Sequence, residues 1–189
     1  HYTYGCANAR GQMKATVRAI LLDPEARGDA KTDPHYGKLR EPVLFYVNTV
    51  RATTNDYGEN DLRIVKDNVG RMGQMVFYSP TVFNFYRPDY QLPGMTLRGP
   101  EFEVLDSRTS VMRANSASIF ATRFNSLSPY AALASDPPKL VAALDQWLLH
   151  GTMSPALRAQ VLEAISKADK KAQMAAFLVL VSPEYQVQR

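Results

Sequence analysis

Apolar residues recur at helical spacing near the start of the chain. Between about residue 10 and residue 22 they lie three or four positions apart, and basic residues lie four apart on another face. This pattern predicts an amphipathic helix that ends at Asp23-Pro24, because proline disfavours helical geometry in the residue before it. Glu25 to Arg27 are expected to add one turn. The apolar face comprises Met13, Val17, Ile20 and Leu21, and the basic face comprises Arg10, Lys14 and Arg18.

A second helix is expected from about Leu39 to Ala52. Pro42 lies where a first helical turn tolerates proline, and apolar residues follow it at suitable spacing. The β-branched residues of VLFYVNTV also suit a strand, so that alternative stays open at this point.

The middle of the chain carries turn signals. Residues 53–73 show no sustained period, so an irregular connection is expected there. Ser79-Pro80 combines a capping hydroxyl with proline at the first helical position and predicts one or two helical turns over TVFNFY. The residues from 88 to 100 are rich in proline and glycine and are expected to be extended or turning chain.

The longest helix is predicted from Pro100 to about Arg123. Glu101 and Glu103 lie in its first turn, where negative charge suits the helix dipole. Apolar residues follow at spacings of three and seven, with small polar residues in the same stripe. The stripe comprises Phe102, Leu105, Thr109, Met112, Ser116 and Ile119.

Three further helices are predicted near the C-terminus. One begins at Asp136-Pro137 with Leu140, Leu144, Trp147 and Leu148 on one face, and Gly151 supplies a left-handed stop. A second begins at Ser154-Pro155, where the serine is the N-cap. The last, from about residue 170 to residue 181, contains AAFLVLV and is apolar on nearly all sides, so it belongs inside the protein.

These elements predict a mainly α protein. We expect an irregular bundle of about six helices with long proline-rich connecting loops. The 189 residues suit one compact helical domain, residues 1–189. Because AAFLVLV needs neighbours on most sides, the chain alone is expected to be prone to aggregation without further partners.

Composition narrows the function classes. A net charge of +4, with the basic residues spread along the chain, supports only weak attraction to polyanions, so no nucleic-acid partner is expected. No segment approaches the about 18 uninterrupted apolar residues of a membrane span. The single cysteine, Cys6, can form neither an internal disulfide nor a structural zinc site and is taken as inert.

Candidate catalytic and metal-binding groups are few. The chain has no G-x-S-x-G elbow, and its histidines are His1, His35 and His150. His150 precedes Gly151 and suits a helix C-terminus, whereas His35 is a plausible base only with distant partners. Acidic and amide residues between 55 and 61 could hold calcium, yet their spacing favours a solvated turn. No metal and no cofactor are therefore predicted. The calcium candidates are Asn55, Asp56, Glu59, Asn60 and Asp61.

Three groups of motifs carry a family resemblance. They are MKATVRAILLDPEARG followed by YGKLREPVL, then FYSPTVFNFYRPDYQLPG followed by PEF, and LVSPEYQVQR. In order and wording they resemble the C-terminal part of the bacterial domain of unknown function 1800 family. The resemblance implies a larger, mostly helical protein that is exported, hence secreted or periplasmic, and often encoded beside a sulfatase-like family numbered 1501. It implies no established activity. Under this resemblance the chain's partners are the upstream half of the same protein or a partner chain, including a sulfatase-like protein.

An aromatic tract is the most distinctive chemical feature. It holds Phe77, Tyr78, Phe83, Phe85, Tyr86 and Tyr90. Packing of these rings against the helices is one interpretation. The other is that Tyr86, Arg87 and Tyr90 line a binding surface, since aromatic and arginine side chains concentrate binding energy at interfaces. Prolines at 88 and 93 fix extended backbone there, which lowers the entropy lost on binding.

Two functions follow from these observations. The first is a helical packing or interaction domain of an exported bacterial protein, without its own catalytic set. The alternative is part of an extracellular enzyme acting on a polymer or ester, with the active site largely in an upstream half.

Overall fold

The computed structural model describes residues 11–27, 36–53, 59–123 and 130–188. Contacts divide the chain into two compact units, one of residues 1–37 with 189 and one of residues 38–188. The first unit contains α1 (Met13–Leu22) and α2 (Pro24–Arg27), separated at Asp23, whose extended backbone precedes proline as the sequence predicts. The single-domain organisation stays a prediction.

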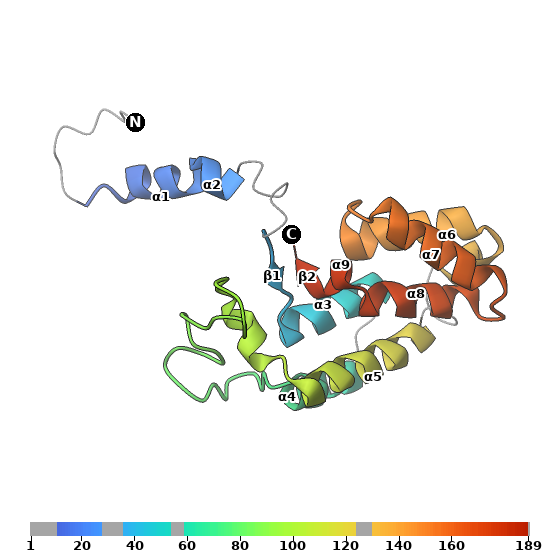
Figure 1. Ribbon diagram of the computed structural model, residues 1–189, viewed down its shortest axis with the longest axis horizontal. Coiled ribbons are helices and arrows are strands. Elements are labelled where there is room, and N and C mark those ends of the chain that lie inside the picture. The colour runs from blue at the N-terminus through green and yellow to red at the C-terminus, as the bar shows by residue number, and fades with distance from the viewer. Residues whose placement is uncertain (1–10, 28–35, 54–58, 124–129, 189) are drawn as a thin grey trace. The chain divides into compact units, whose positions relative to one another are not determined.

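The second unit is mainly α-helical, as predicted (Figure 1). The expected helix near residues 39–52 is confirmed, so the strand alternative for VLFYVNTV is wrong. In chain order its elements are β1 (Lys38–Leu39), α3 (Pro42–Thr53), α4 (Glu59–Arg71), a 3₁₀ helix (Pro100–Val104), α5 (Ser107–Arg123), a 3₁₀ helix (Ala131–Ser135), α6 (Pro137–Leu144), a π-helix (Asp145–Leu149), α7 (Pro155–Ser166), α8 (Lys171–Val181), α9 (Pro183–Gln186) and β2 (Val187–Gln188).

The core of the second unit forms around α8. This helix packs against α5, α6, α7 and α9. Its residues Ala172, Ala175, Ala176, Val179 and Leu180 are fully buried, which accounts for the all-round apolar sequence. The chain thus supplies the neighbours that this helix needs. Aggregation of the isolated chain stays a prediction, but an uncovered α8 cannot be its cause.

Capping residues fix three helix starts, two of which, at Asp136 and Ser154, the sequence predicts. Asp136 accepts a hydrogen bond from the backbone N–H of Lys139 (3.2 Å), and Ser154 accepts one from Leu157 (3.1 Å). Ser182 ends α8 and caps α9 through the N–H of Tyr185 (3.3 Å). Each cap precedes a proline, whose missing N–H costs nothing in a first helical turn.

A two-stranded antiparallel ladder joins the C-terminal end to the start of α3. Lys38 pairs with Gln188 and Leu39 with Val187. The buried Arg113 of α5 reinforces this joint, because its guanidinium donates to Gln186 Oε1 (2.8 Å) and to the Arg40 carbonyl (2.8 Å). Burial lowers the pKa of Arg113 to about 10, so it remains charged at neutral pH.

Residues 53–73 are not an irregular connection, because α4 occupies most of that span. Val69 and Met72 are buried and Val65 is half-buried, a set at helical spacing. Most of the neighbouring residues are polar, so the helical spacing of these three apolar residues is difficult to recognise in the sequence. Packing of that stripe on the neighbouring α3 and α5 supplies the stability that the local pattern lacks.

The predicted long helix from Pro100 is broken into a 3₁₀ helix and α5. Asp106 causes the break, because its carboxylate accepts the backbone N–H of Thr109 (2.6 Å) and caps a new helix. Two members of the predicted stripe, Thr109 and Ser116, are buried in α5 as expected, whereas Ile119 is exposed.

The end of α6 departs from the predicted face. Trp147 was expected on the same face as Leu144 and Leu148, yet 60% of it is exposed. The π-helix is the cause, since an extra residue in the turn rotates the following side chains relative to an α-helix.

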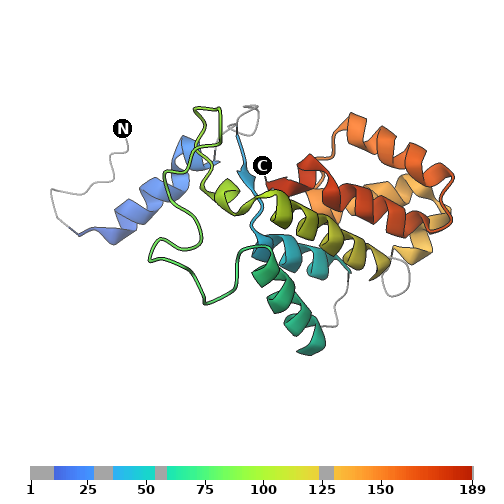
Figure 2. The same cartoon turned by 60° about the horizontal axis from the view of Figure 1, so that its bottom comes forward.

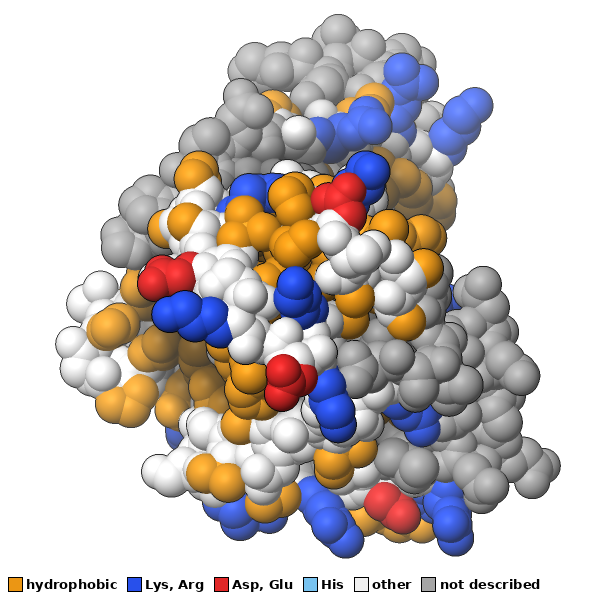
Figure 3. Space-filling view, turned by 90° about the vertical axis from the view of Figure 1, so that its right-hand side faces the viewer, with side chains coloured by type: hydrophobic (Ala, Val, Ile, Leu, Met, Phe, Trp, Pro, Cys, Tyr) orange, Lys and Arg blue, Asp and Glu red, His pale blue; other side chains and the backbone are white. Residues whose placement is uncertain are grey.

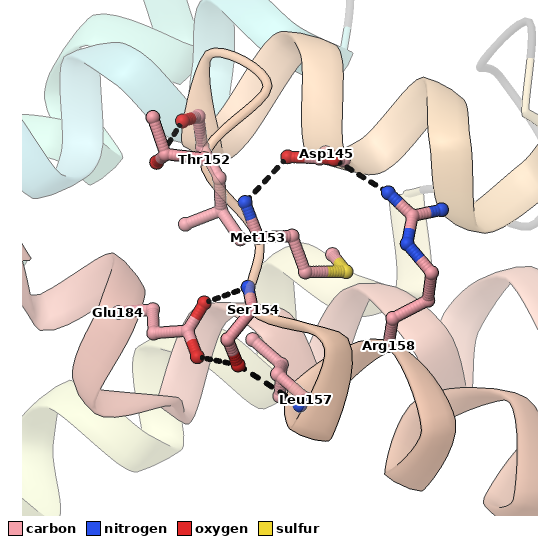
Figure 4. A network of polar contacts seen from close by, with 8 residues as sticks. Asp145, Thr152, Met153, Ser154, Leu157, Arg158 and Glu184 are labelled. Carbon is pink, nitrogen blue, oxygen red and sulfur yellow. Dashed lines mark hydrogen bonds and ion pairs between the residues drawn. The ribbon is translucent and has the colours of Figure 1, made fainter.

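The connection between α6 and α7 is held by a polar network (Figure 4). The buried carboxylate of Asp145 accepts the N–H of Met153 (3.0 Å) and pairs with Arg158 (2.6 Å). Glu184 of α9 accepts the N–H of Ser154 (2.9 Å) and also its hydroxyl. The turn is thereby tied to α7 and to α9.

Replacing Asp145 with alanine is expected to lower the free energy of unfolding by about 1–3 kcal/mol, since the Met153 N–H is left buried without an acceptor. Urea denaturation of the variant measures the loss. The control is Lys139→Ala, which removes an exposed ion pair with Asp136 and is expected to change stability little. Equal, small effects of the two substitutions would contradict a structural role for the network.

Charge is dispersed on the end of the molecule where α6, α7 and α8 lie. In Figure 3 acidic and basic side chains are scattered among apolar ones, and neither sign forms a continuous field on this face.

Candidate functional site: an exposed aromatic loop

A long loop leaves the helices between α4 and the 3₁₀ helix at Pro100 (Figure 2). We call residues 75–99 the aromatic loop. Its start is clamped by the buried side chain of Gln74, whose Oε1 accepts the N–H of Val43 (2.9 Å) and whose amide donates to Glu41. The amide therefore holds the loop against the first turn of α3.

A short hairpin forms the C-terminal part of the aromatic loop. Gln91 and Arg98 form an antiparallel bridge, and the N–H of Leu92 donates to the carbonyl of Leu97 (3.2 Å). Below it, Gly99 is buried, and a β-carbon there would lie 2.7 Å from Cδ1 of Leu92 and 2.9 Å from Cδ2 of Phe102. The close approach requires glycine at this position and fixes the hairpin against the 3₁₀ helix.

Arg87 attaches the loop to the 3₁₀ helix. Its backbone N–H donates to Glu103 Oε2 (2.5 Å) and its Nε to Oε1 (2.8 Å). These bonds lower the pKa of Glu103. The guanidinium carbon also lies 5.9 Å from the ring centroid of Tyr90. Arg87 thus joins the middle of the aromatic loop to Glu103 of the 3₁₀ helix and also contacts Tyr90 within the loop.

Tyr86 faces carboxylates. Burial, together with the nearby carboxylates of Glu41, to which it is hydrogen-bonded, and Glu101, raises its pKa to about 12. The phenol therefore keeps its proton at neutral pH and serves as a hydrogen-bond donor. It provides a further tie between the loop and the start of α3.

The N-terminal part of the aromatic loop presents apolar side chains to solvent. Phe77 is 98% exposed and Val82 is 95% exposed, and Tyr78 and Phe83 are also exposed. Isolated exposed apolar residues are ordinary, whereas these four lie within one short stretch of the loop.

The backbone of this part is unusual. Phe77 (φ 67°) and Asn84 (φ 77°) lie in the left-handed region, which is costly for a bulky residue such as phenylalanine. Thr81 supports the second of these turns, since its hydroxyl accepts the N–H of Phe83 (3.1 Å) and donates to the carbonyl of Asn84 (3.3 Å). The one or two helical turns predicted after Ser79-Pro80 are therefore wrong. The left-handed Asn84 and the threonine-centred turn replace them.

A family comparison bears on the whole chain. Residues 5–187 match the family described as Protein of unknown function (DUF1800). The chain belongs to this family. Comparison with curated proteins and with solved structures found no match. The resemblance noted from the sequence motifs is confirmed for this DUF1800 chain, and membership by itself assigns no activity.

Within the described residues, no three His, Cys, Asp or Glu side chains gather as metal ligands would, and no helix is both long and apolar enough to cross a bilayer. His150 forms the left-handed C-cap of the π-helix, as its position before Gly151 suggested. The other candidates, His1, Cys6, Arg10, His35 and the side chains of residues 55–61, lie outside the described part.

The three binding residues predicted from the sequence form the attached part of the aromatic loop. Tyr86 and Tyr90 are half-buried, and Arg87 is exposed but paired with Glu103. Their role in binding stays a prediction for this DUF1800 chain. The most exposed apolar positions lie N-terminal to them. Phe77 and Phe83 belong to the aromatic tract seen in the sequence, whereas Val82 was missed because a helix was expected there.

Proposed function

We propose that this chain is a helical interaction domain that binds an apolar protein surface through the aromatic loop, without a catalytic set of its own. The observation that carries the proposal is the nearly complete exposure of Phe77 and Val82 on a loop held at Gln74, Arg87 and Gly99. A held loop loses little conformational entropy on binding. The exposed apolar side chains supply the driving force.

The size of the available driving force supports a protein partner. Burying a Phe or Val side chain contributes about 1.5–3 kcal/mol. Phe77, Tyr78, Val82 and Phe83 together offer enough apolar surface for a specific contact. The polar base of the loop, with Arg87 and Glu103, suits the rim of such an interface.

The occupant we propose is an apolar protein surface, contributed by an upstream half of the same polypeptide or by a partner chain. In line with the family resemblance, we also propose that the protein is bacterial and exported, and that a sulfatase-like protein of the family numbered 1501 is one partner chain. Both sources would offer an apolar surface to the loop, and crosslinking distinguishes the same polypeptide from another chain.

Site-specific photo-crosslinking tests the interaction. A benzophenone amino acid placed at position 77, in the cell that makes the protein, is expected to form crosslinks to a defined peptide, which mass spectrometry then assigns to the same polypeptide or to another chain. The matched control places the probe at position 111 on α5, an exposed valine outside the loop. Val82→Ser is expected to weaken the position-77 crosslink about tenfold or more, because apolar contact area is lost.

Two outcomes would contradict the proposal. One is that positions 77 and 111 give the same pattern of crosslinks, which would show that contact at the loop is unspecific. The other is that Val82→Ser leaves the position-77 crosslink at full strength while the thermal melt of the protein is unchanged.

A further inference from the structure

A second concave site lies away from the aromatic loop, where the end of α3 meets the π-helix that follows α6. It encloses about 340 Å³. That volume is at the lower end of the range for small-molecule sites, about 300–1,000 Å³, and is too small for a macromolecule. Its lining residues are Asn48, Arg51, Ala52, Gln146, Trp147 and His150.

Two irregular backbone features build this pocket. The π-helix turns Trp147 out of the core, and His150 follows in the left-handed conformation (φ 58°). π-turns and left-handed residues other than glycine are both costly and occur often at functional sites. The Asp145 network in Figure 4 and a hydrogen bond from the Gly151 N–H to the Asp145 carbonyl (3.2 Å) hold both features in place. The pocket wall is therefore fixed before any ligand binds.

The side chains of the pocket are chemically available. Among the described residues, the side chains of Arg51, Trp147 and His150 have no hydrogen-bond or ion-pair partner. Asn48 and Gln146 add amide groups to the lining, and none of the described lining residues is acidic. Arg51 thus brings a positive charge to the pocket that no carboxylate among the described lining residues offsets.

We propose that this pocket binds a small carboxylate that carries a flat ring. The indole of Trp147 offers a face on which a ring stacks, and the planar guanidinium fork of Arg51 matches the two oxygens of a carboxylate. His150 and the amides of Asn48 and Gln146 add polar groups to the same lining. The proposal is independent of the function proposed for the aromatic loop.

The composition of the chain makes the test specific. Trp147 is the single tryptophan, so indole fluorescence and the indole N–H resonance report on this pocket alone. The probes are benzoate, benzamide, which lacks the charge, and acetate, which lacks the ring. Benzoate is expected to shift the Trp147 signals saturably, with an affinity in the millimolar range that suits so small a ligand. Benzamide and acetate are expected to bind about tenfold more weakly or worse.

Variants separate the pocket from unspecific binding. Arg51→Gln is expected to weaken benzoate binding about tenfold or more and to leave benzamide unaffected, because the substitution removes a charge-assisted contact. Its exposed side chain has no partner among the described residues, so the fold should survive, which a thermal melt checks. The control is Arg108→Gln at the start of α5, which lines no part of the pocket and should bind benzoate as the original protein does.

Either of two results would overturn the proposal. Equal shifts of the Trp147 signals with benzoate and acetate would show that no ring is recognised. Equal benzoate affinity in Arg51→Gln and Arg108→Gln would show that the guanidinium of Arg51 takes no part.

Discussion

Replacing Tyr185 with alanine is expected to lower the free energy of unfolding by about 3–5 kcal/mol. The ring is fully buried and meets Phe45 edge-on, with 5.4 Å between ring centroids, and the guanidinium of Arg40 lies over it at 4.3 Å. The hydroxyl donates to the Phe45 carbonyl (3.0 Å) and lies 2.8 Å from Thr49 Oγ1. One side chain near the C-terminus thus holds α3, and its loss leaves both a cavity and unsatisfied polar groups.

Tyr185→Phe separates the two contributions. The ring stays and only the hydroxyl is lost, so a smaller loss of about 1–2 kcal/mol is expected. Urea denaturation followed by circular dichroism measures both variants. If both unfold at the same urea concentration as the original protein, the joint between α9 and α3 contributes little to stability.

Alkaline conditions are expected to unfold the protein through its buried tyrosines. Burial raises the pKa of Tyr46 and of Tyr130 from 10.0 to about 12, and it also raises the pKa of Tyr185. Between pH 10 and pH 12 Tyr46 and Tyr130 lose their protons in the unfolded chain but keep them in the folded one. The unfolded state then binds fewer protons, so the free energy of unfolding falls as the pH rises.

The expected loss is about 1.4 kcal/mol for each fully shifted tyrosine between pH 9 and pH 11, hence about 2.7 kcal/mol for Tyr46 and Tyr130 together. Urea denaturation at both pH values measures it. Tyr46→Phe is the control, because phenylalanine does not ionise. Its free energy of unfolding should fall by about 1.4 kcal/mol less than that of the original protein between pH 9 and pH 11. An identical loss in Tyr46→Phe and the original protein would contradict the assignment.

Local signals in the sequence were sufficient for several elements. Ser154-Pro155 and Asp136-Pro137 place helix starts correctly because capping joins a side chain to a backbone N–H only two or three residues away. The apolar run of α8 correctly predicts burial, since such a helix has no face suited to water. In both cases the deciding interaction is local or depends on composition alone.

Other elements depend on contacts between distant parts of the chain. The β1–β2 ladder joins residues at opposite ends of the second unit, and two-residue strands leave no pattern in the sequence. The Asp106 cap and the π-helix each interrupt an apolar spacing that would otherwise continue as a regular helix. A periodicity argument assumes an uninterrupted helix and therefore misplaces Trp147.

For the candidate sites, the sequence by itself determined the residue types, and the tertiary structure decided their exposure. The aromatic tract is visible in the sequence, and so are Arg51, Trp147 and His150. Whether a ring is buried or presented to solvent depends on which surfaces the rest of the chain covers, and that is settled only when the elements pack. Phe45 and Phe77 are the same residue type, yet one lies in the core and the other is almost wholly exposed, because α3 packs against other helices whereas the aromatic loop is held only at its ends and base.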